Sequence, residues 1–108
     1  MSLDADGIYE KIMESAREWT HADEESRRLV ELKPIVLAEI VNQQDQDLSL
    51  AARTSLAQAS PEYRLHVTNM IAAKTKANMA QARYKAAQSL AELRRSQESS
   101  RRAEMNIR

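Results

Sequence analysis

Two pairs of adjacent arginines are the residues in this chain best placed to bind another molecule. Arg94-Arg95 and Arg101-Arg102 are seven residues apart, and this spacing puts both pairs on one face of a helix. Guanidinium groups presented in this way bind phosphates or the carboxylates of an acidic protein surface. A solvated helix end, whose cations suit the negative end of the helix dipole, explains the same residues without a partner. Both interpretations stay open.

The charge of the whole chain is divided between its two ends. Residues 1–47 sum to −7 and residues 73–108 to +6, although the chain is formally neutral. Such asymmetry indicates either that the two ends neutralise each other by packing side by side or that the basic end binds an acidic partner. The candidate binding residues for a protein or a nucleic acid are all basic and lie in the second half of the chain: Lys74, Lys76, Arg83, Arg94, Arg95, Arg101 and Arg102. No base-reading pattern accompanies them, so nucleic-acid contacts would go to the phosphate backbone.

Residues capable of catalysis or metal binding are sparse. His21 and His66 are the only histidines, and neither has a second ligand at the spacing that metal sites use. Adjacent or near-adjacent carboxylates occur at two places, which are Glu24 with Glu25 and Asp45 with Asp47. Paired carboxylates act as acid and base only in a pocket that separates their pKa values, and a solvated helix face is the simpler interpretation. The sequence therefore predicts no catalytic residue, no metal site and no cofactor.

The composition excludes several classes of protein. The chain has 108 residues, one glycine, two prolines and no cysteine, which leaves room for one domain and excludes glycine-rich phosphate loops, disulfides and thiol chemistry. No apolar run reaches the length of a membrane-spanning helix. We therefore expect an all-α protein of the cytoplasm with no membrane partner.

Helix signals divide the chain into four predicted helices, at about 5–33, 34–43, 48–58 and 61–103, in a single domain 1–108. Asp4 or Asp6 is suited to cap the first helix. Pro34 interrupts an apolar stripe and predicts a kink or break at Lys33, with Pro34 opening a new helix. Residues 42–47 are polar and predict a loop. Ser60-Pro61-Glu62 is a strong start signal for the last helix.

The last helix carries a heptad seam in which most residues are alanine. The seam positions alternate spacings of three and four, and they are Met70, Ala73, Ala77, Ala80, Tyr84, Ala87 and Ala91. Lys76 and Arg83 flank this seam, while Glu18, Glu25 and Glu39 flank the apolar stripe of the first helix. Antiparallel pairing would bring the acidic flank against the basic one. The expected fold is a long, coiled-coil-like antiparallel helical hairpin with a short middle helix.

A hairpin of this size leaves part of its apolar stripe uncovered unless the middle helix or a second copy covers it. The residues concerned lie on the first two predicted helices and are Trp19, Leu29, Val36, Leu37 and Ile40. Exposed stripes of this extent usually mark an interface. We therefore expect a homo-oligomer or a chain that docks on a larger protein.

Alanine- and arginine-rich helical segments recur in the second half of the chain, namely Ser60-Pro61-Glu62-Tyr63, Ala77-Asn78, Ala82-Arg83-Tyr84 and Arg101-Arg102-Ala103-Glu104-Met105. They carry a resemblance to small all-helical accessory proteins of tailed bacteriophages and prophages. It implies a non-enzymatic protein that acts by helix-mediated protein–protein interaction in phage DNA metabolism or counter-defence, in the cytoplasm of a bacterial host. Sequence-independent nucleic-acid binding and inhibition of a host nuclease or defence complex are the alternatives.

Overall fold

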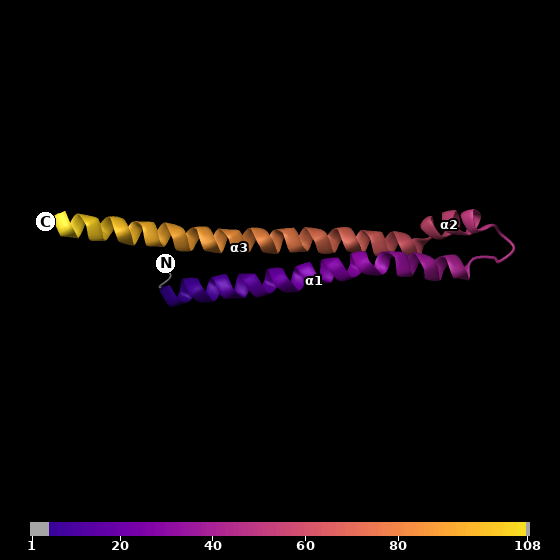
Figure 1. Ribbon diagram of the computed structural model, residues 1–108, viewed down its shortest axis with the longest axis horizontal. Coiled ribbons are helices and arrows are strands. Elements are labelled where there is room, and N and C mark those ends of the chain that lie inside the picture. Colours follow the sequence, from indigo (N-terminus) through magenta and orange to yellow (C-terminus); the bar gives the residue numbers. More distant parts are fainter. Residues whose placement is uncertain (1–4, 108) are drawn as a thin grey trace. The chain divides into compact units, whose positions relative to one another are not determined.

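Every regular element that the computed structural model shows is a helix. The structure describes residues 5–107, which form α1 (Ala5–Gln43), α2 (Leu50–Gln58) and α3 (Pro61–Ile107), with no strand in that range. α1 and α3 run in opposite directions and α2 lies in the connection between them (Figure 1). The predicted all-α helical hairpin is confirmed. Asp4, one of the two predicted capping residues, lies outside the described residues, and Asp6 lies inside the first turn of α1.

The packing of the chain divides into two compact units. The first unit combines residues 1–20 with 78–108, and the second contains residues 21–77. Each long helix therefore contributes one part to each unit. In both units the pairing of α1 with α3 is antiparallel, and only the second unit contains α2.

Small side chains form most of the core of the first unit. Ala80 and Ala87 on α3 are 1% and 3% exposed, and Ser15 on α1 is 7% exposed. The hydroxyl of Ser15 donates to the Lys11 carbonyl at 2.8 Å, which satisfies the hydroxyl inside its own helix. The bulky contact is between Trp19 and Tyr84, whose ring centroids are 5.4 Å apart at 32°. All seven predicted seam residues of α3 are buried or half-buried.

The core of the second unit lies where α2 meets the two long helices. Ile40, Val41 and Ala57 are buried there, and partly buried side chains of Val36, Leu37 and Tyr63 pack against them. Ala57 is fully buried, which shows how closely α2 approaches α1. The middle helix therefore covers the part of the predicted apolar stripe that Val36, Leu37 and Ile40 form.

The predicted start of a new helix at Pro34 is wrong, because α1 continues through it. A proline inside a helix lacks the N–H that the Val30 carbonyl needs, which costs about 3 kcal/mol. Burying Ile40 and Val41, at 3% and 8% exposure, returns about 1.5–3 kcal/mol each. The helical turns beyond Pro34 are thus held in place by the core that they help to form.

The ends of α2 and α3 have identifiable caps. Ser49 caps α2, since its side chain accepts a hydrogen bond from the Ala52 N–H at 3.1 Å. Ser60 caps α3 in the same way through the Tyr63 N–H at 3.2 Å, with Pro61 as first helical residue. α1 ends at Gln43, as the predicted bounds 34–43 have it, whereas α2 begins at Leu50, two residues after its predicted start. α3 ends at Ile107, beyond the predicted end at residue 103.

Candidate functional site

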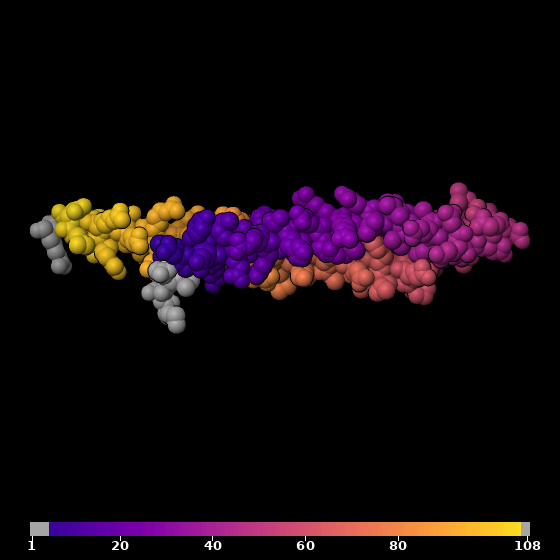
Figure 2. Space-filling view, turned by 90° about the horizontal axis from the view of Figure 1, so that it is seen from below, coloured from indigo at the N-terminus to yellow at the C-terminus, as the bar shows by residue number. Residues whose placement is uncertain are grey.

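The last turns of α3 are helical but have no neighbouring helix among the described residues. Every side chain from residue 95 to residue 106 is exposed, whereas Ala91 and Arg94 just before them are half-buried. We call residues 95–106 the α3 tail. Figure 2 shows its surface continuing past the beginning of α1. A stretch of exposed helix at the end of a packed seam is the most unusual surface of the first unit.

Four arginines lie at this end of α3, as the sequence predicts. Arg94, Glu98, Arg101 and Met105 continue the seam that packs on α1 further back, at the same alternating spacing. Arg95 and Arg102 each follow a seam arginine directly in sequence. The Arg94 guanidinium and the Glu98 carboxylate are 3.9 Å apart, at the outer limit for an ion pair. The four cations therefore surround one carboxylate.

Arg83 is the fifth arginine predicted to bind a partner, and it already forms an ion pair within the chain. Its Nε lies 3.5 Å from Glu18 Oε2, and among residues 5–107 this is the ion pair that joins α1 to α3. Both side chains are about half exposed, so the pair contributes about 0.2–1 kcal/mol. The pairing of the acidic flank with the basic flank, which the heptad positions predicted, is confirmed at this point.

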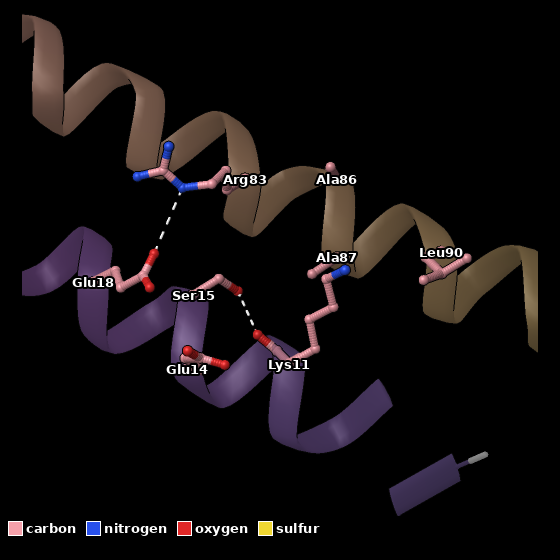
Figure 3. A pocket seen from close by; sticks show the side chains of 8 residues that line it. All are labelled: Lys11, Glu14, Ser15, Glu18, Arg83, Ala86, Ala87 and Leu90. Carbon is pink, nitrogen blue, oxygen red and sulfur yellow. Dashed lines mark hydrogen bonds and ion pairs between the residues drawn. The ribbon is translucent and has the colours of Figure 1, made fainter. Parts of the chain in front are cut away.

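A groove lies beside this ion pair, between α1 and α3 of the first unit. It encloses about 480 Å³, and we call it the unit 1 groove. The residues lining it come from both helices and are Lys11, Glu14, Ser15, Glu18, Arg83, Ala86, Ala87 and Leu90. Figure 3 shows the Lys11 side chain reaching toward Ala87 on α3. Small residues of α3 form one wall, and charged residues of both signs lie along its edges.

The two lysines of the predicted binding set lie in the second unit. Lys74 borders a shallow hollow of about 350 Å³ with Asp23 and Glu31 of α1, and Lys76 is exposed. The seven basic residues therefore do not form one site. The four arginines of the α3 end are the group that stands without an acidic neighbour on α1.

The predicted apolar interface residues make contacts within the chain. Trp19 stacks on Tyr84, Val36 and Leu37 pack against the α2 core, and Ile40 is buried in it. The large apolar side chains that are exposed are others. On α3 three of them, Leu65, Met79 and Leu93, belong to a row of exposed residues with a constant spacing of seven, together with Ala72 and Ala86. This row could have been predicted from the sequence by its spacing of seven.

His66 has a role that sequence reasoning missed. Its Nε2 lies 2.7 Å from the Leu29 carbonyl of α1, and because a carbonyl only accepts, Nε2 carries the proton. The bond reaches the helical turn that precedes Pro34. Tyr63 and His66 extend the predicted seam by one more heptad, which is the signal that could have placed the imidazole against α1. His21 is exposed.

Searches for other kinds of site gave negative results over the described part of the chain. Residues 5–107 contain no cluster of histidines and carboxylates that could hold a metal ion. In the same range, no helix is both long and apolar enough to span a membrane.

Comparison of the chain with protein-family models, with curated proteins and with solved structures returned no match.

Proposed function

We propose that this chain is a non-enzymatic protein that acts by helix-mediated protein–protein interaction through the α3 tail. The observation that carries the proposal is the complete exposure of residues 95–106 at the end of a seam that packs on α1 elsewhere. A partner helix that lies on this segment would continue the packing that α1 provides up to Arg94. The exposed turns at the end of a helix fray, so a partner would also stabilise them.

The charges of the α3 tail favour a protein partner over a nucleic acid. The tail carries three arginines, at 95, 101 and 102, with Glu98 and Glu104, so that it sums to only +1, and adding Arg94 and Glu92 leaves this sum unchanged. Attraction to phosphates depends on uncompensated positive charge, whereas mixed charges of this kind are typical of helix–helix interfaces. Glu98, in the middle of the arginines, would repel a phosphate backbone.

The setting in which this interaction operates follows the resemblance to phage accessory proteins. A role in phage DNA metabolism or counter-defence, including the inhibition of a host nuclease or defence complex, is one in which a small helical protein docks on a larger one. The chain needs no catalytic group for any of these roles.

The proposal is tested by affinity capture from a lysate of the native host, with partners identified by mass spectrometry. The variant R94A/R95A/R101A/R102A should lose the partner that the unchanged chain retains. The control variant K74A/K76A lacks two exposed cations of the same helix that lie outside the tail, and it should retain the partner. Circular dichroism of both variants checks that the fold is preserved, as expected for solvated positions.

Binding to duplex DNA and to single-stranded RNA, measured over a series of salt concentrations, tests the alternative. The proposal predicts no binding at physiological salt. Binding whose salt slope falls by roughly three to four units in the four-alanine variant would identify phosphate contacts and would contradict the proposal. Retention of the protein partner by that variant would contradict it as well.

A further inference from the structure

We propose that a second copy of this chain occupies the α3 tail, with the tail of each copy lying in the unit 1 groove of the other. This inference rests on the proposed function, because it names the partner of the same surface. It makes the chain a closed dimer in which both tails are covered. Three properties of the first unit support it: the position of tail and groove, their dimensions and their charges.

The tail and the groove belong to the same unit and lie next to each other on α3. Leu90, which lines the groove, is only five residues from the first residue of the tail. Two copies that approach end to end can therefore exchange tails at the same time. An interface in which each copy gives and receives the same element is the isologous arrangement of two-fold dimers. Such a dimer is closed, because no tail remains free to add a third copy.

The dimensions of the two elements are compatible. The tail has 12 residues, which gives a helix of about 18 Å. Along α1 the groove extends from Lys11 to Glu18, or about 11 Å, so that the tail is long enough to fill it. Ala86 and Ala87 form the α3 side of the groove. Their small side chains allow another helix to approach closely, as in helical bundles.

The charges of the two elements are complementary. Four acidic residues repeat at a spacing of four along the first turns of α1: Asp6, Glu10, Glu14 and Glu18. This spacing forms a continuous row on a helix surface. Glu18 pairs with Arg83, and the other three form no ion pair with any residue in the range 5–107. Within residues 5–107, the arginines at 95, 101 and 102 likewise form no ion pair, and Arg94 reaches only Glu98, at 3.9 Å.

The groove also offers a cation for the acidic residues of the tail. Lys11 lines it beside Glu14, so a tail lying there presents arginines to carboxylates and Glu98 to an ammonium group. A duplex nucleic acid would satisfy the arginines but would leave Glu98 without a favourable contact.

The experiment measures the mass of the complete chain by light scattering and sedimentation over a concentration series. The unchanged chain, 12.3 kDa, should give twice this mass at low salt and dissociate more readily at high salt. Reversing Arg94 and the three tail arginines (R94E/R95E/R101E/R102E) should weaken the dimer at least about 10-fold, because the exposed ion pairs of both contacts, worth a few-fold each, are lost. Reversing the acidic row (D6K/E10K/E14K) should weaken it to a similar extent.

Mixing the two reversed variants provides the decisive measurement. Each variant alone should be a monomer, because its tails and rows carry the same sign of charge. Together the two variants should form a one-to-one dimer, because one contact joins a reversed tail to a reversed row and the other joins an unchanged tail to an unchanged row. The control E24K/E25K changes two exposed acidic residues of α1 in the second unit and should leave the dimer unchanged. Circular dichroism verifies that each variant is folded.

Several results would overturn the inference. The unchanged chain could remain one chain mass at all concentrations, or the dimer could be insensitive to reversal of the tail, or the mixed variants could fail to associate. These outcomes are distinct from a failure of the proposed function. A chain that is monomeric but loses its host partner in the four-alanine variant would retain the docking function and refute only the second copy as occupant.

Discussion

Replacing Pro34 by alanine should stabilise the protein by about 2 kcal/mol. The proline lies inside α1, where it costs about 3 kcal/mol relative to alanine, because the Val30 carbonyl loses its helical donor and the ring crowds the preceding turn. Alanine also gives the unfolded chain more freedom, which opposes the gain by about 0.4–1 kcal/mol. The difference is the expected stabilisation, and it corresponds to an increase of about 8–16 °C in the melting temperature of a domain of this size.

Urea denaturation followed by circular dichroism measures this change. The midpoint should rise with an unchanged slope, since the surface exposed on unfolding stays the same. K33A is the matched control, because Lys33 is the exposed neighbour of Pro34, and it should stay within about 0.5 kcal/mol. Unchanged or reduced stability of P34A would refute the reasoning. It would mean that the packing of Val36 and Ile40 requires the backbone geometry that the proline imposes.

Three further predictions concern the contacts between α1 and α3. A80L should destabilise the first unit by about 1–3 kcal/mol, since a larger side chain does not fit a position that is 1% exposed, whereas A82L at an exposed position of the same helix should be nearly neutral in urea denaturation. H66A should cost about 1 kcal/mol through loss of the bond to the Leu29 carbonyl, and H21A, at an exposed histidine, should not; equal effects of the two substitutions would contradict the role of His66. A double-mutant cycle of W19A and Y84A should give a coupling of about 0.5–1.5 kcal/mol for rings 5.4 Å apart, and a coupling near zero would show that the two rings contribute independently.

The parts of the fold that depend on local sequence were predictable. The Ser60-Pro61 start signal and the alanine seam depend on neighbouring residues and on the heptad period, and α3 begins and packs as they indicate. The same heptad period predicted Glu18 on the acidic flank and Arg83 on the basic flank, and the two side chains form an ion pair. Heptad position is sufficient for such contacts, because pairing of two long helices fixes which flanks meet.

The parts that depend on packing between distant residues were not predictable in the same way. The break at Pro34 followed from a local rule, whereas the continuous helix depends on burial of Ile40 against Ala57 of α2, which the sequence alone does not place there. Trp19 and Val36 were predicted to belong to an apolar interface, and their contacts with Tyr84 and with the α2 core depend on which distant residues meet. The arginines at 94, 95, 101 and 102 were identified from their spacing, but the exposure of the last three depends on how α1 pairs with α3.

The affinity of the exposed α3 tail for a partner depends on how stable the tail is as a helix. Exposed turns at the end of a helix fray, and the helical fraction before binding multiplies the intrinsic affinity. Ser96, Ser99 and Ser100 are exposed positions of the tail, and serine is a weaker helix former than alanine. Serine-to-alanine changes at these positions would therefore tighten binding without adding a contact to the partner. The three serines would in this way influence how strongly the arginines bind, without contacting the partner.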